Sequence, residues 1–174
     1  ILLFDISLQK VWDKASKDTM GLKAYFKQNK KNYTWDKPHY RGYMIYAKNA
    51  EAAKRAELII KTVAPDSINS FITQHINNDS VQLVKVVKGI WEQGKDAAVD
   101  KYAFKLKKTA YTPKEQFPVV SACKGKVLKR PTLYTDVLRQ VVSDYQDALE
   151  QEWIKELKNK YTIQVYPDIL ESLR

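Results

Sequence analysis

The sequence predicts an α+β fold in which a small sheet with packed helices is flanked by an N-terminal helical arm and a long C-terminal helix. Segments 40–48, 81–88 and 117–124 alternate like strands, and helically spaced apolar residues separate the first two. A further pattern, with apolar positions three and four residues apart, continues from Thr132 to Lys160. At about 1.5 Å per residue this last helix would be roughly 42 Å long. Such a length exceeds what one small domain needs.

Residues 1–37 are expected to form the helical arm. Residues 2–7 alternate weakly like a strand, and a short helical segment follows at 9–15. A second helix is predicted from Ser16 to about Asn29, because Asn and Lys residues there are typical of a helix C-terminus. Its buried face would consist of Leu22, Tyr25 and Phe26.

Residues 38–130 are expected to form the α+β domain. After Pro38, a strand at 40–48 leads to Asn49, which is a good N-cap for a helix over 50–62. A short helix is predicted from Pro65 to about His75. Its inward residues would be Ile68, Phe71, Ile72 and Ile76.

The second half of this domain is predicted to contain two more strands. A turn at 77–80 precedes a strand at 81–88, and Gly89 and Gly94 indicate an irregular segment over 89–101. The last strand is expected at 117–124. Cys123 would be a buried residue of that strand, since a free cysteine usually behaves as a small hydrophobe.

Residues 131–174 are predicted to form the long helix and a short strand at 160–165, packing on the N-terminal arm. Trp153 and Leu157 are the expected anchors of this helix. If Trp153 were fully buried, its replacement by Ala would cost on the order of 3 to 5 kcal/mol.

The composition limits the classes of partner and chemistry. A net charge of +10 on 174 residues suits nucleic acid, anionic membranes or acidic proteins as partners. The single cysteine excludes an intrachain disulfide. Because the sequence begins in mid-pattern at Ile1, we expect a piece of a longer protein with a signal peptide upstream.

Several segments together resemble the C-terminal part of SurA/PrsA-like periplasmic foldases, with a parvulin-type peptidyl-prolyl isomerase domain at 38–130. The resemblance covers nearly the whole chain and rests on order and spacing rather than on one strict motif. The matching segments are Gly21–Lys30, Tyr43–Lys48, Ala50–Ala53, Asp144–Gln146 and Glu152–Lys158.

The sequence departs from that family at the residues expected to act in catalysis. Catalytic parvulins carry one histidine at the head of the first strand, where this chain has Met44, and another on the last strand, where it has the run 119–123. The glycine-rich segment of the family is reduced to Lys88–Gly94. His39 and His75 would lie before the first strand and in the second helix, and match neither position.

The resemblance implies a groove for a proline or another client side chain. Its candidate residues are Met44, Trp91, Val99, Tyr102 and Phe104. Isomerisation needs a rotation barrier of about 18–20 kcal/mol to be lowered, and an apolar pocket can do part of this without histidine. No residue is identified as catalytic, and no cofactor is expected. A metal site is not expected either, because His39 and His75 lack the spacing of zinc ligands.

A segment of interleaved basic and aromatic residues, 23–43, leaves two interpretations open. Such a segment can bind single-stranded nucleic acid by stacking and phosphate contacts. It can equally be a helix with a buried aromatic face and a solvated lysine face, and this second interpretation is favoured.

The leading hypothesis is therefore a periplasmic or otherwise extracytoplasmic folding factor that binds unfolded or nascent secreted and outer-membrane polypeptides, with a degenerate isomerase site. The alternatives are an active parvulin-type isomerase and a basic nucleic-acid-binding module.

Overall fold

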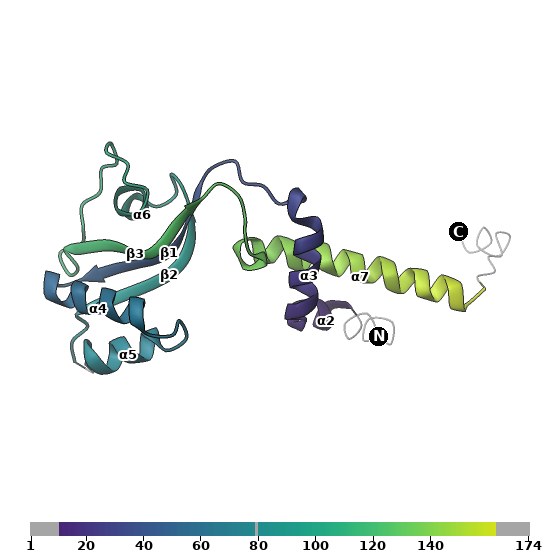
Figure 1. The fold of residues 1–174 in the computed structure, drawn as a ribbon, viewed down its shortest axis with the longest axis horizontal. Coiled ribbons are helices and arrows are strands. Elements are labelled where there is room, and N and C mark those ends of the chain that lie inside the picture. The colour runs from purple at the N-terminus through teal and green to yellow at the C-terminus, as the bar shows by residue number, and fades with distance from the viewer. Residues whose placement is uncertain (1–10, 79, 163–174) are drawn as a thin grey trace, which may run out of the picture. The chain divides into compact units, whose positions relative to one another are not determined.

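The computed structural model describes residues 11–78 and 80–162, and the chain divides into two compact units (Figure 1). Residues 1–33 and 133–174 form the first, named here the helical unit. Residues 34–132 form the second, named the sheet unit. The predicted α+β class is confirmed. The strand expected at 2–7 lies outside the described residues, as do residues 163–165 of the strand expected at 160–165. The first part of that second expectation was wrong, because Lys160 ends the long C-terminal helix and residues 161 and 162 are not in a strand.

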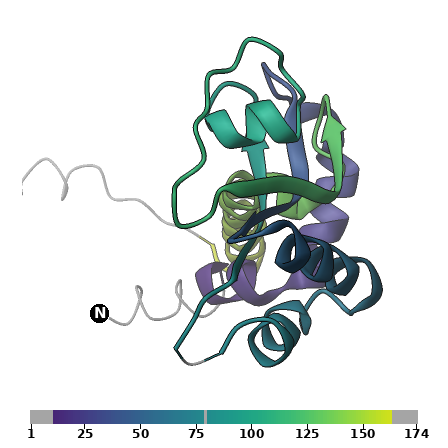
Figure 2. The same ribbon diagram turned by 90° about the vertical axis from the view of Figure 1, so that its left-hand side faces the viewer.

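The sheet unit is built on three antiparallel strands in the order β2-β1-β3. The central strand β1 (His39–Ala47) pairs with β2 (Val84–Glu92) on one side and with β3 (Val119–Leu128) on the other. Helices α4 (Ala50–Thr62) and α5 (Ile68–His75) cover one face, and α6 (Ala97–Tyr102) covers the opposite face (Figures 1 and 2).

Alternation along β1 divides its side chains between two cores, since successive residues of a strand point to opposite faces. Tyr43, Ile45 and Ala47 pack with the apolar faces of α4 and α5. Tyr40, Met44 and Tyr46 belong to the core on the α6 side. The central strand is therefore buried on both sides of the sheet.

The first helix after β1 begins as predicted. The Asn49 side chain accepts a hydrogen bond from the Ala52 backbone N–H at 2.8 Å, which satisfies one of the unpaired donors of the first turn. Ala56 and Ile60 are fully buried on its inner face. In α5, Ile68 and Ile72 are buried as expected, but Phe71 was wrongly expected to face inward and is 39% exposed, where its ring stacks on His75.

The prediction of an irregular segment over 89–101 was wrong. Strand β2 begins at Val84 and continues through Gly89 to Glu92, and α6 begins at Ala97. Asp96 caps α6 by accepting hydrogen bonds from the backbone N–H groups of Ala98 and Val99. A strand glycine and a six-residue helix produce no lasting apolar period, which explains the error.

The helical unit consists of α2 (Asp13–Lys17), α3 (Thr19–Asn29), the 3₁₀ turns η2 (Lys30–Asn32) and η3 (Tyr134–Val137), and α7 (Leu138–Lys160). Its main core contains four buried side chains, namely Leu22, Phe26, Tyr33 and Val141. The long helix was expected from Thr132 but begins at Leu138. The residues before it form η3, in which the Asp136 carboxylate accepts a hydrogen bond from the Leu133 N–H.

Two tyrosine hydroxyls link the segments of this unit. Tyr33 donates to the Asp144 carboxylate at 2.8 Å, and Tyr145 donates to Asp18, the N-cap of α3, at 2.9 Å. On α7 the buried side chains are Val141 and Leu149. The expected anchors Trp153 and Leu157 are only half-buried, because Trp153 packs at the margin of a small cluster formed by Val11, Ala15 and Leu149. The cost expected for a fully buried Trp153 therefore does not apply.

Tyr33→Phe should lower the free energy of unfolding by about 1 to 2 kcal/mol, because it removes a hydrogen bond to a carboxylate. Burial, followed by the hydrogen bond to Asp144, raises the pKa of Tyr33. The neutral phenol thus stabilises the folded state fully below its unfolded pKa of about 10, and this contribution is lost as pH rises further.

Urea denaturation at neutral pH and above pH 10 measures both effects. The variant should lose less stability than the wild type in the alkaline range. Tyr161→Phe, at a 57% exposed position, serves as the matched control. Equal behaviour of the two variants would contradict the role given to the Tyr33 hydroxyl.

Candidate functional site: an aromatic cavity on one face of the sheet

Three glycines lie side by side across the three strands of the sheet. Gly42 of β1 is the register partner of Gly89 on β2, and a Cβ added to Gly42 would lie 2.5 Å from the Cα of Gly125 on β3. We name these residues the glycine row. A glycine inside a strand often indicates that another group approaches the backbone closely.

Two aromatic rings occupy the space above the glycine row. A Cβ on Gly42 or Gly125 would overlap the Tyr40 ring, and one on Gly89 would lie 2.8 Å from Cζ2 of Trp91. Tyr40 and Trp91 are themselves register partners, with ring centroids 6.0 Å apart and planes 24° from parallel. The absent side chains of the glycine row thus allow both rings to lie against the sheet.

The Tyr40 hydroxyl fixes this arrangement at an irregularity of the β1–β3 ladder. The register shifts between Arg41 and Tyr43, where Lys124 adopts a φ of 45°. The hydroxyl lies 3.4 Å from the Tyr43 carbonyl oxygen and 3.3 Å from the Cys123 carbonyl oxygen, to which its proton is donated. Burial raises the pKa of Tyr40, so it remains a neutral donor.

The five residues predicted for the groove all belong to one apolar cluster on this face. Met44 and Val99 are fully buried in it, and Trp91, Tyr102 and Phe104 pack around them. The Phe104 ring packs edge to face against Tyr40, and the ring planes of Tyr102 and Tyr111 are at 90° to each other. Met44 and Val99 therefore form an apolar floor on which the partly buried rings pack.

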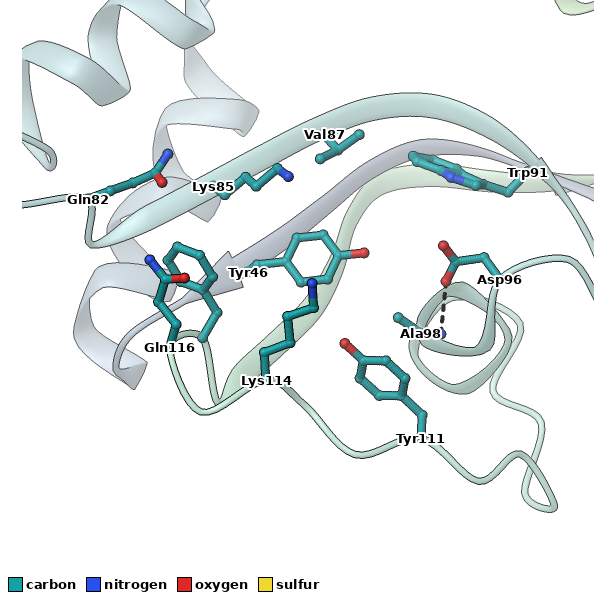
Figure 3. A pocket seen from close by; sticks show the side chains of 11 residues that line it. Tyr46, Gln82, Lys85, Val87, Trp91, Asp96, Ala98, Tyr111, Lys114 and Gln116 are labelled. Carbon is teal, nitrogen blue, oxygen red and sulfur yellow. Dashed lines mark hydrogen bonds between the residues drawn. The ribbon is translucent and has the colours of Figure 1, made fainter.

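A cavity of about 570 Å³ opens beside this cluster (Figure 3). Trp91 is the one predicted groove residue in its lining. The other lining residues come from β1, from β2 and the segment just before it, from the start of α6 and from the loop before β3. The lining residues are Tyr46, Gln82, Lys85, Val87, Trp91, Asp96, Ala98, Tyr111, Lys114, Gln116 and Phe117.

Two tyrosine hydroxyls near Asp96 belong to the polar part of the cavity lining. Burial raises the pKa of Tyr46 to about 12, with smaller contributions from Asp96 and Tyr111. Burial, Tyr102 and Asp96 likewise raise the pKa of Tyr111. Both phenols are therefore neutral at physiological pH and able to donate hydrogen bonds to a ligand.

Sequence reasoning missed most of this lining. Tyr46 follows Met44 by two residues, so strand alternation alone would have placed both on the same face. Tyr111, Lys114 and Gln116 lie in the segment between α6 and β3, which has no regular period. No local signal in that segment points to the cavity.

The two histidines lie apart from the cavity lining. His39 was expected before the first strand but is the first residue of β1. Its ring stacks on that of Trp35, with the two ring centroids 3.9 Å apart. His75 lies in the last turn of α5, where its Nδ1 is 2.9 Å from the Phe71 carbonyl oxygen. Over residues 11–78 and 80–162, no group of three or more His, Cys, Asp or Glu residues is placed to hold a metal ion.

The aromatic residues of segment 23–43 serve mainly in packing. Phe26 and Tyr33 are buried in the helical unit, with ring centroids 5.3 Å apart, and Tyr40 and Tyr43 are buried in the sheet unit. Rings in these positions are unavailable for stacking on bases. The arrangement agrees with the favoured interpretation of a buried aromatic face.

None of the helices in the described part of the chain has both the length and the apolar composition needed to cross a membrane.

Comparisons of the sequence with protein-family models, with curated proteins and with solved structures find no match. Functional inference therefore depends on the cavity and on the sequence resemblance.

Gly125→Ala should destabilise the sheet unit by about 1 to 3 kcal/mol, because the new methyl group overlaps the Tyr40 ring. In a Tyr40→Ala background the same substitution should cost much less. A double-mutant cycle from urea denaturation measures this coupling. Additivity within about 0.5 kcal/mol would contradict the contact.

Tyr46→Phe should reduce the alkaline loss of stability. Since the folded pKa of Tyr46 is about 12 and the unfolded value about 10, its contribution is present below pH 10 and lost as pH rises toward 12. The difference should stay below about 1 kcal/mol because the phenol is partly exposed. Unfolding free energies at about pH 9 and pH 11 test this, with Tyr161→Phe as the control. An unchanged alkaline slope in Tyr46→Phe would overturn it.

Proposed function

We propose that this chain is the client-binding part of an extracytoplasmic protein-folding factor related to SurA/PrsA-like foldases. Its cavity would hold side chains of unfolded polypeptides, and its isomerase site would be degenerate. The observation that carries the proposal is the aromatic cavity over an apolar floor on one face of the sheet.

Cross-strand pairing at the floor of the site supports binding rather than catalysis. In the sequence resemblance, Met44 and the run 119–123 stand where catalytic parvulins have histidines. Met44 is the register partner of Ala122, a residue of that run, and both belong to the apolar cluster. Neither side chain can exchange a proton with a substrate.

The cavity suits loosely specific recognition of an unfolded chain. Trp91, Tyr111 and Phe117 offer rigid apolar area, which gives contact energy at little cost in side-chain entropy. The neutral hydroxyls of Tyr46 and Tyr111 can donate to backbone carbonyls of the client, which are present in any sequence. Ligand sites commonly combine apolar walls with a few such polar groups.

The compartment and the clients follow from the resemblance alone. An extracytoplasmic folding factor of this kind would act on secreted or outer-membrane polypeptides before they fold. No cofactor is required for such binding.

Trp91→Ala and Tyr111→Ala should each weaken binding of a permanently unfolded client about fivefold or more, as expected for aromatic anchors at the centre of an interface. The measurement is fluorescence anisotropy of a labelled reduced protein, together with suppression of its aggregation. Leu58→Ala is the matched control, because Leu58 is an apolar side chain, 62% exposed, on α4 at the opposite face of the sheet. Equal effects of the three variants on client binding would contradict the proposal that the cavity is the binding site.

An active isomerase is the second candidate, because an apolar cavity can desolvate an X-Pro amide. A protease-coupled assay on a proline-containing peptide separates the two functions. We expect no acceleration at micromolar protein. If the wild type accelerates isomerisation and Trp91→Ala does not, the site is an active isomerase site and the proposal of a degenerate site is wrong.

A further inference from the structure

We infer that the cavity selects client segments in which an acidic residue neighbours an aromatic or other apolar residue. This inference rests on the proposed function and specifies the class of ligand that the same site takes. It is carried by the positions of Lys85 and Lys114 in the cavity lining and by the hydrogen bonds that engage the nearby carboxylates.

The excess positive charge of the chain is concentrated in the sheet unit. Residues 34–132 contain 18 Lys and Arg residues and 9 Asp and Glu residues, so they carry nine of the ten net positive charges. A potential of one sign over a cleft raises the local concentration of ligands with the opposite charge. The unit as a whole therefore favours acidic ligands.

Two carboxylates of the α6 segment, Asp96 and Asp100, are already engaged by backbone donors. Asp96 accepts hydrogen bonds from the N–H groups of Ala98 and Val99 at the start of α6. Asp100 is buried and accepts from the Gly94 N–H at 2.9 Å. These hydrogen bonds stabilise the start of α6 and the loop before it.

Lys85 and Lys114 supply the positive charge of the lining. Lys85 comes from β2 and Lys114 from the loop before β3, and Figure 3 shows the Lys114 side chain extending toward the Tyr46 ring. In the described part of the chain, ion pairs join Lys17 to Asp13 and Lys61 to Glu57, and neither pair includes Lys85 or Lys114. Both ammonium groups can therefore bind a carboxylate of a ligand.

The combination of positive charge and aromatic surface in one cavity favours a peptide as the occupant. The ammonium groups share one cavity with Trp91, Tyr46 and Tyr111, so a single ligand has to satisfy both kinds of surface. An acidic side chain next to an aromatic one does so within two or three residues of an extended chain. Lysine residues in the same ligand would be repelled by Lys85 and Lys114. The site therefore discriminates between acidic and basic client segments.

The test uses the full chain and three fluorescein-labelled peptides that share a central Phe-Pro-Phe segment. Their flanking residues are Glu, Gln or Lys. Anisotropy titrations at about 50 mM and 300 mM salt should give the affinity order Glu, Gln, Lys, with the Glu peptide about fivefold to tenfold tighter than the Gln peptide at low salt. The difference should shrink at high salt.

The double variant Lys85→Gln/Lys114→Gln should bind the Glu and Gln peptides equally, with the affinity for the Gln peptide unchanged. Lys54→Gln, on the solvent side of α4, removes a lysine from the opposite face of the sheet and should leave the preference intact. Circular dichroism establishes that each variant is folded.

The possible outcomes separate the inference from the proposed function. Equal binding of the Glu and Gln peptides by the wild type would overturn the acidic preference and leave client binding in place. A preference that persists in the double variant would overturn the assignment to Lys85 and Lys114. Absence of binding to all three peptides would overturn the proposed function as well. A labelled single-stranded oligonucleotide titrated in parallel covers the remaining alternative, since binding to it alone would also overturn the proposed function.

Discussion

The glycine row is the constraint on which the sheet unit depends. Gly89, Gly42 and Gly125 remove the side chains from one line across three strands, and Tyr40 and Trp91 take up that space. Tyr40 then bonds to backbone carbonyls at the irregular part of the β1–β3 ladder, and Trp91 reaches the cavity. Strand pairing and the cavity wall are thus parts of one arrangement, because a methyl group at the row would disturb both.

Strand β1 separates two surfaces with different composition. On one side, Ile45 and Ala47 pack with α4 and α5 in a mostly aliphatic core. On the other side, Met44 and Val99 are covered mainly by rings, and α6 is only six residues long. A short helix leaves part of the aromatic layer uncovered, and the cavity lies there. The proposed binding function therefore belongs to the face that the fold closes least completely.

Much of the fold could be predicted, because its signals are local. The alternation at 40–48, the Asn49 cap and the apolar surroundings of Cys123 each specify a conformation within a few residues. The errors arose where a residue serves a distant partner. Gly89 was interpreted as a break, although it lies inside β2 as the register partner of Gly42 on β1. The candidate groove identified the apolar cluster but only one residue of the cavity lining, since Tyr111 and Lys114 are positioned by tertiary packing rather than by a repeating pattern.

The order β2-β1-β3 leaves the outer edges of β2 and β3 without a strand partner in the described part of the chain. Unpaired edges are templates on which extended polypeptides can add as further strands and begin aggregation. Here β2 carries Lys85 and Lys88, and β3 carries Lys124 and Lys126. Charged side chains, lysine above all, oppose edge-to-edge association. A protein that handles extended, aggregation-prone chains would in this way avoid being incorporated into the aggregates that it is proposed to prevent.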